Sequence, residues 1–267
     1  MTSQYLGGLV IKILYLDFER GSQTLGSRDK IQEMFGYPMI AMSSWNQFQS
    51  MIGQLYTKQK TTNVIKIGTL EIPEESVEVL PKDGNVVDAL ILDTFSELSK
   101  KFQRSLTDKN GKMKLQDWGV LKSKLDTALD FITSIPGIVI CNVHSKIQTM
   151  DDGTSKILPY IDGGTKEDIS KWFDFVFYAR TVLDPTGKRQ YIWITKRSEM
   201  FDNAKDRTDV LPAEMPQDYS KVIEAAKHKG FDNVRVLIIG SPGSGKTYSL
   251  QTLVKGGSNE NTESKDG

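Results

Sequence analysis

The sequence feature that most restricts the fold is a glycine-rich segment late in the chain. Residues 240–247 read GSPGSGKT and directly follow the apolar run VRVLII of residues 234–239. The pattern G-x-x-x-x-G-K-[ST], placed between a strand and a helix, is typical of a loop that binds nucleotide phosphates. Its glycines let backbone N–H groups turn toward phosphate oxygens, because no β-carbon blocks the path. A chain with this loop is expected to fold around an α/β sheet.

The side chains of the loop predict how it binds its ligand. Lys246 is expected to reach the β- and γ-phosphates, and the Thr247 hydroxyl to coordinate Mg²⁺. Residues 248–254 are predicted to form a helix whose positive N-terminus faces the same phosphates. The predicted nucleotide-binding residues are Gly240, Ser241, Pro242, Gly243, Ser244, Gly245, Lys246, Thr247 and Tyr248.

Elsewhere the chain alternates short apolar runs with helical patterns. The predicted strands are residues 10–16, 89–92, 138–141 and 234–239, and the predicted helices are 27–35, 44–56, 95–106, 117–132 and 219–227. This alternation predicts right-handed crossovers and a mostly parallel sheet with helices on both faces. Residues 173–182 and 190–195 flank a DPTG turn and are predicted to form a hairpin.

Two segments fit this scheme less well. Residues 63–72 are either a strand or an excursion from the fold, and the pattern does not decide between them. Residues 145–170 are mixed and polar and contain three glycines, so they are predicted to be a long loop that is either functional or disordered.

Composition excludes several classes of protein. The 34 Lys and Arg residues balance 34 Asp and Glu residues, which argues against a generally basic nucleic-acid coat but permits a local basic loop. The single cysteine, Cys141, excludes a disulfide scaffold and is expected to pack in the core; His228 receives no role. No apolar run approaches 18 residues, and the N-terminal segment lacks a basic start. A cytoplasmic protein with no membrane segment is expected.

The order of the motifs is unusual for a phosphate-binding loop. In ordinary P-loop proteins the loop comes first, whereas here the acidic strand ends, at Asp17 and Glu19 and at Asp93, precede it. A circular permutation would explain this: joining Gly267 to Met1 places the loop before both strands. We therefore predict one domain over residues 1–255, in which residues 234–254 complete the sheet begun at 10–16. The tail 256–267 is predicted to be disordered.

In the rejoined order the chain resembles the RecA-like P-loop ATPases of bacteriophages, in the group linked to single-strand annealing and recombination. The matching pieces are GSPGSGKT, ILYLDFERG, ALILDTFSEL, LQDWGVLKSKL, IVICNVHSK, WFDFVFYAR and AKDRTDVLP. The resemblance implies a RecA core in which another strand lies between the P-loop strand and the Walker B strand. It also implies ATP as the ligand.

The same resemblance assigns roles to residues at the strand ends. Glu19 falls where the family carries the carboxylate that polarises the attacking water, and Asp93 where an aspartate holds Mg²⁺ through water. His144, together with Asn142, follows the strand whose end senses the γ-phosphate. A carboxylate at the carboxyl end of a parallel strand faces the ligand crevice, which agrees with these roles. Capping of the strand ends is the alternative for Glu19 and Asp93, and a surface position for His144.

Lys205 and Arg207 resemble the K-x-R element by which RecA-like rings and filaments reach the nucleotide of a neighbouring subunit. This implies a homo-oligomer in which each copy completes the next copy's site. A solvated charge cluster is the alternative.

Two stretches correspond to the DNA-binding loops of RecA-like proteins, residues 100–114 and 145–171. The first is locally basic, and the second has balanced charge. The candidate DNA-binding residues are Lys109, Lys112, Lys114 and Lys146. A solvated basic helix face is the alternative.

The function favoured by these observations is a Mg²⁺-dependent ATPase that acts on single-stranded DNA in phage recombination or replication. One alternative is a nucleotide-gated assembly or protein-remodelling ATPase that does not bind DNA. Another is a nucleotide-binding scaffold with little turnover.

Overall fold

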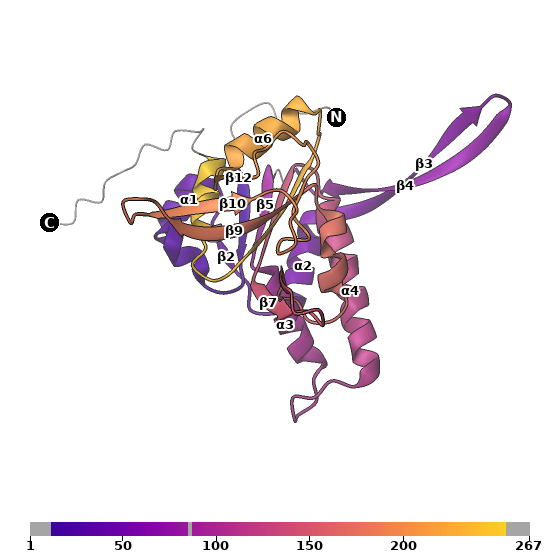
Figure 1. Cartoon of the computed structure of the whole chain (residues 1–267). Coiled ribbons are helices and arrows are strands. Elements are labelled where there is room, and N and C mark those ends of the chain that lie inside the picture. The colour runs from indigo at the N-terminus through magenta and orange to yellow at the C-terminus, as the bar shows by residue number, and fades with distance from the viewer. Residues whose placement is uncertain (1–11, 85–86, 255–267) are drawn as a thin grey trace.

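The computed structural model describes residues 12–84 and 87–254 (Figure 1). The predictions for residues 10–11 and for the tail 256–267 lie outside the described residues. The first described strand, β1, spans Ile13–Asp17 and so ends one residue later than predicted.

The central sheet is mostly parallel, as the sequence predicts. Within the described residues it has nine strands in the order β12-β10-β9-β13-β6-β5-β1-β2, with β11 paired to β9. The parallel strands are β1, β2 (Ile40–Ala41), β5 (Ala89–Asp93), β6 (Ile138–Val143), β9 (Phe175–Leu183) and β13 (Val234–Gly240). The antiparallel strands are β10 (Arg189–Ile194), β11 (Lys205–Asp206) and β12 (Glu214–Pro216). Strand β6 lies between β13, which leads into the glycine-rich loop, and β5.

The predicted helices form close to their predicted limits. They are α1 (Arg28–Phe35), α2 (Trp45–Leu55), α3 (Phe95–Leu106), α4 (Leu115–Thr133) and α6 (Tyr219–His228). The hydroxyl groups of Ser27 and Ser44 accept the backbone N–H of Lys30 and Gln47 at 3.3 and 3.2 Å, so each serine caps its helix.

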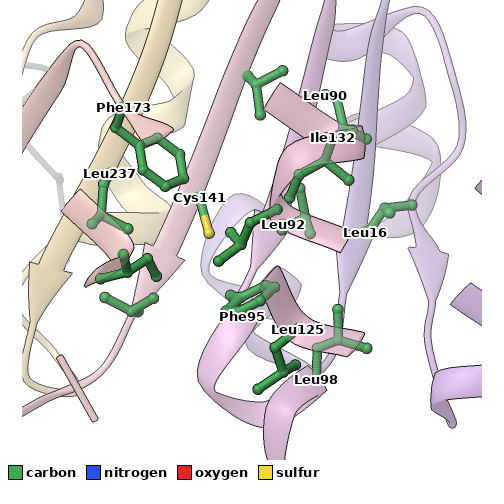
Figure 2. Packing of buried hydrophobic residues seen from close by; sticks show 14 of the residues in the cluster. Leu16, Leu90, Leu92, Phe95, Leu98, Leu125, Ile132, Cys141, Phe173 and Leu237 are labelled. Atoms are coloured by element: carbon green, nitrogen blue, oxygen red, sulfur yellow. The ribbon is translucent and has the colours of Figure 1, made fainter. Parts of the chain in front are cut away.

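The helices cover both faces of the sheet. Side chains of α2, α3 and α4 pack on one face in a cluster that includes Cys141, which is fully buried as expected. Figure 2 shows Cys141 among the residues of α3 and α4. Side chains of α1 and α6 pack on the other face, together with the 3₁₀ helix η3 (Leu250–Leu253). Both faces of the parallel strands are therefore apolar, which explains their continuous apolar runs.

Two predictions about connecting segments need correction. Residues 145–170 are not a loop: β7 (Ser145–Thr149) pairs with β8 (Ser155–Pro159), and the short helices α5 (Thr165–Asp168) and η2 (Ile169–Trp172) follow. The helix predicted at 248–254 begins earlier, as α7 (Lys246–Ser249), and continues as η3. Gly245 is the N-cap of α7, and its φ of 89° lies in the left-handed region that favours glycine.

The undecided segment around residues 63–72 belongs to a long hairpin. Strands β3 (Tyr56–Ile67) and β4 (Leu70–Pro81) pair over their whole length and extend away from the rest of the molecule (Figure 1). Pro73 and the four glutamates of β4 hide the strand pattern in the sequence, because proline and charged residues are uncommon in strands.

Candidate nucleotide-binding site

The site lies at the carboxyl ends of the parallel strands. Asp93 of β5 is in register with Asp17 of β1 on one side and with Asn142 of β6 on the other. Strand β13 runs parallel to β6 and ends at Gly240, where the glycine-rich loop begins. Segments that are more than 200 residues apart in the chain, around Asp17 and Gly240, therefore meet at one edge of the sheet.

The glycine-rich loop is held closely against its surroundings. Gly245 has a left-handed backbone, and a β-carbon there would lie 2.7 Å from the Tyr191 ring. Gln217 donates its side-chain N–H to the Ser244 carbonyl oxygen at 2.7 Å, and Thr181 donates its hydroxyl to the Gly243 carbonyl oxygen at 3.3 Å. Only glycine fits at position 245, so the loop is shaped by the strands around it before any ligand contacts it.

Lys246 and Thr247 point into the site from the start of α7. The Lys246 ammonium is buried and donates to the carbonyl oxygens of Gly240 and Ser241 at 2.7 and 2.9 Å. Burial lowers the pKa of Lys246, although Asp93 and Glu19 act in the opposite direction. A cation with this little hydration is well suited to a phosphate group.

Asp93 connects the loop to the sheet. Its carboxylate accepts hydrogen bonds from the Thr247 hydroxyl at 2.7 Å, the Tyr15 hydroxyl at 2.9 Å and the Asn142 side-chain amide at 3.1 Å. Burial raises the pKa of Asp93, and these three hydrogen bonds oppose the rise. The Thr247 hydroxyl and the Asp93 carboxylate are oxygen donors of the kind that Mg²⁺ prefers, so the pair fits a Mg²⁺ ion. Among the described residues no group of three or more His, Cys, Asp and Glu side chains could hold a metal by itself.

Glu19 lies beside Asp93 in the loop after β1. Its carboxylate contacts His144 Nε2 at 2.6 Å and accepts a hydrogen bond from the Thr94 hydroxyl. Burial alone would raise the pKa of Glu19, but the hydrogen bonds from His144 and Thr94 hold it below its usual value. Glu19 is therefore an anion near neutral pH and can accept a hydrogen bond from a water molecule.

Asp17 shapes the loop that carries Glu19. Its buried carboxylate accepts the backbone N–H groups of Glu19, Gly21 and Ser22 at 2.9, 3.2 and 3.1 Å. A β-carbon on Gly21 would lie 3.8 Å from the Thr247 hydroxyl, so this loop contacts α7 closely. Asp17 thereby fixes the backbone that carries Glu19, while His144 and Thr94 hold its carboxylate.

Sequence reasoning named Asp17 only as an acidic strand end without a role, and it missed Thr94 and Tyr15, which also organise the site. Asp17 and Thr94 had a usable signal, because each stands at or just beyond the carboxyl end of an apolar strand. Tyr15 had none: it lies inside a buried strand, and only the register of β1 with β5 brings its hydroxyl to Asp93.

The candidate DNA-binding lysines fall in two places. Lys109, Lys112 and Lys114 are exposed in the turn between α3 and α4. Lys146 of β7 lies 5.7 Å from the ring of Tyr160, and Lys100 of α3 lies 4.6 Å from the same ring.

Lys205 and Arg207 lie away from the nucleotide site of their own chain. Lys205 pairs with Val176 near the start of β9, whereas Gly240 pairs with Ala179 farther along that strand. Along the sheet they are therefore three to four strand residues, roughly 10–13 Å, from the start of the glycine-rich loop. The Arg207 guanidinium contacts Asp174 at 2.9 Å, and the Lys205 ammonium donates to the Ser170 carbonyl oxygen at 2.7 Å.

A phosphate-binding loop at the end of a parallel strand, beside an aspartate on a second strand, defines a P-loop nucleotide-binding protein. Comparison with family models refines this class: the model described as AAA domain matches residues 3–208, more than half of the chain. The chain therefore belongs to the AAA domain family, which indicates a nucleotide-binding ATPase. The matched range includes Glu19, Asp93, His144 and Arg207, while the glycine-rich loop lies beyond it. No similar protein was found among curated proteins or among solved structures.

One further finding concerns membranes. In the part of the chain that the structure describes, every helix is too short or too polar to cross a bilayer.

Proposed function

We propose that the protein hydrolyses ATP in a Mg²⁺-dependent reaction at the edge of the sheet where the glycine-rich loop meets β5. The observation that carries this proposal is the 2.7 Å contact between the Thr247 hydroxyl and the Asp93 carboxylate. It joins a phosphate-binding loop to a buried carboxylate from a distant part of the chain, which is the pairing that a Mg²⁺–nucleotide complex requires.

Each group then has a role in hydrolysis. The backbone N–H groups of the loop and the Lys246 ammonium bind the phosphates, and Thr247 and Asp93 hold Mg²⁺. Mg²⁺, when bound, supplies charge neutralisation at the β- and γ-phosphates. Glu19 accepts a hydrogen bond from the attacking water and orients it. His144 holds the Glu19 carboxylate in place and keeps it ionised.

Tyr248 completes the nucleotide-binding set. Its ring is about half exposed and lies 5.9 Å from the Tyr191 ring, next to the loop. We propose that this pair of rings offers the nucleotide an aromatic surface beside the phosphates, where a base can stack.

The active unit in this proposal is a homo-oligomer, a ring or a filament. Lys205 and Arg207 lie too far along the sheet from the loop of their own chain to contact its nucleotide. Arg207 is half exposed and pairs only with Asp174 among the described residues, so it is accessible to a neighbouring copy. A cation delivered in this way would stabilise charge on the γ-phosphate.

Single-stranded DNA is the proposed effector. Tyr160 presents a partly exposed ring close to the ammonium groups of Lys100 and Lys146, and single strands bind such combinations of aromatic surface and cations. The Tyr160 backbone N–H donates to the His144 carbonyl oxygen at 2.6 Å, and His144 in turn contacts Glu19. DNA bound to this surface would contact Tyr160, which is linked through His144 to the Glu19 carboxylate that orients water. Lys109, Lys112 and Lys114 would extend the contact to further phosphates.

We also propose that the chain is a circular permutation of a RecA-like domain. Support comes from the strand order β9-β13-β6-β5-β1, in which the P-loop strand is central although it comes last in the described sequence. A chain rearranged to begin at residue 230, with Gly267 joined to Met1, should fold and bind nucleotide. We propose a role for the protein in phage recombination or replication because its sequence motifs resemble those of phage RecA-like ATPases.

The test is steady-state ATP hydrolysis with Mg²⁺, measured with and without single-stranded DNA. We expect DNA to stimulate turnover, and the double variant Tyr160→Leu/Lys146→Ala to lose the stimulation while its basal rate is unchanged. Lys227→Ala, an exposed lysine on α6, is the matched control. A turnover rate that is the same with and without DNA would favour an assembly or remodelling ATPase instead. Nucleotide binding without any turnover would indicate that the protein is a nucleotide-binding scaffold.

A further inference from the structure

The β3–β4 hairpin carries an apolar cluster at its tip that the described residues leave exposed. Ile65 pairs with Ile72, and Ile67 pairs with Leu70, across the two strands. Alternate residues of a strand point to one face, so these four side chains share a face of the tip. They are 39–63% exposed.

The hairpin has little to stabilise it along most of its length. Tyr56 and Val79 are buried at its root, but most residues between them are exposed, and the ribbon extends away from the sheet (Figure 1). A two-stranded ribbon alone is only marginally stable in water. A partner packed against the apolar face of the tip would therefore stabilise it.

A groove that suits this tip lies between α2 and α4. It has a volume of about 210 Å³, which is less than a small-molecule site usually needs and more suitable for one or two side chains. Its apolar lining residues are Trp45, Phe48, Ile52, Ala128, Phe131 and Ile132.

The groove cannot be filled by the tip of the same chain. Tyr56, the first residue of β3, directly follows α2, so the groove lies at the root of the hairpin. Ile65 is nine strand residues farther along, which places the tip roughly 30 Å away. The tip that enters this groove must therefore come from another molecule.

Charge favours a second copy of this chain as that molecule. Residues 63–75 at the tip hold one lysine and three glutamates, and the single lysine, Lys66, is paired with Glu71. The groove has cations instead: Lys124 lines it, and the Lys58 ammonium lies 5.1 Å from the Phe131 ring. Among the described residues, α2 carries no charged side chain that would offset them. An acidic tip with an apolar face matches an apolar groove with a basic rim.

We infer that the hairpin tip of one copy docks in the α2–α4 groove of the next copy. The two surfaces differ, so the contact is head-to-tail and generates a ring or a filament. This inference concerns how copies meet and does not rest on the proposed ATPase chemistry.

Cross-linking between two cysteine variants tests the contact directly. Ile67→Cys places a thiol on the tip and Gln49→Cys places one at the mouth of the groove, while Cys141 is buried and free, so it will not react. With a short bis-maleimide, we expect covalent dimers when the two variants are mixed. Val64→Cys, which is equally exposed but on the opposite face of the hairpin, is the matched control and should give few.

Light scattering against concentration gives the second readout. We expect Ile67→Asp to raise the concentration for half-assembly by about tenfold or more, and Val64→Asp by less than about twofold. Both are measured with and without Mg²⁺–ATP. Monomers at every concentration, or assemblies that Ile67→Asp leaves intact and that give no tip-to-groove cross-link, would overturn the inference. Neither readout requires hydrolysis, so a failed ATPase proposal would be recognised separately.

Discussion

The carboxyl edge of the sheet and the β3–β4 hairpin place their side chains in opposite ways. At the sheet edge polar groups are buried and bonded to one another, so Asp93 alone accepts three side-chain hydrogen bonds. At the tip of the hairpin apolar groups are exposed and, among the described residues, pair with each other across the ribbon. Buried polar groups are costly unless they are satisfied, and exposed apolar groups are costly unless they are covered. The exposed tip of the hairpin therefore points to a protein surface that covers it. At the sheet edge the indication of a ligand is different: it is the glycine-rich loop with the buried Lys246 ammonium, which suits a small, negatively charged molecule.

The largest effect is expected from Lys246→Ala. Removing the buried ammonium from the phosphate loop should lower ATP turnover by about 10³-fold, as loss of a preorganised electrostatic group does. The measurement is steady-state phosphate release at saturating Mg²⁺–ATP. Lys227→Ala should retain the full rate of turnover. Comparable losses in both variants would indicate that the substitutions disturb the fold, not the site.

Next comes Arg235→Ala, which probes the sheet away from the site. The buried guanidinium donates to the carbonyl oxygens of Thr133, Ile135 and Gly137, at the end of α4 and just beyond it. Burial lowers its pKa to about 10. Its removal should lower the free energy of unfolding by about 3 kcal/mol in urea denaturation.

A second arginine serves as the control for this measurement. Arg207→Ala removes one partly exposed ion pair and should cost at most about 1 kcal/mol. Equal losses for the two variants would contradict the importance of the carbonyl contacts.

His144→Ala should change the pH dependence of turnover. Glu19 must be ionised to act, and its pKa is now below the usual value because of hydrogen bonds from His144 and Thr94. Without His144, burial is less strongly opposed and the pKa rises, so the acid limb of the rate profile should move to higher pH. Turnover measured between about pH 5 and 8 would show the shift. An unchanged acid limb would mean that His144 does not tune Glu19.

The smallest effect is expected on the stability of the hairpin variants. Ile67→Asp and Val64→Asp both change exposed residues, so each should alter the free energy of unfolding by no more than about 0.5 kcal/mol. A large loss for Ile67→Asp alone, measured on dilute monomer, would mean that the tip packs within its own chain.

The difference between the central sheet and the β3–β4 hairpin also explains which elements the sequence could predict. The core strands and the helices with serine caps follow from local patterns, and so does the loop at 240–247. Strands β7 and β8 were missed because each is short and half polar, as in SKIQT and SKILP. The hairpin β3–β4 was undecided because its stability depends on cross-strand pairing, which a local pattern does not reveal.

At the site, residue types were easier to predict than contacts. Glu19, Asp93 and Lys246 stand out at strand ends or in the glycine-rich loop, so their positions follow from the sequence. The Tyr15 and Thr94 contacts depend on strand register and on a turn. Tyr160 meets Lys100 and Lys146 only after three separate elements have packed.

The most direct test of the central claim is ATP binding and turnover by Glu19→Gln. This substitution keeps the shape of the side chain but removes its charge. We expect the variant to bind Mg²⁺–ATP within about threefold of the unmodified protein, because Lys246, Thr247 and Asp93 are intact, and to lose turnover by about 10²-fold or more. Unchanged turnover would contradict a catalytic carboxylate in the loop after β1, and with it the single site assembled from distant parts of the chain.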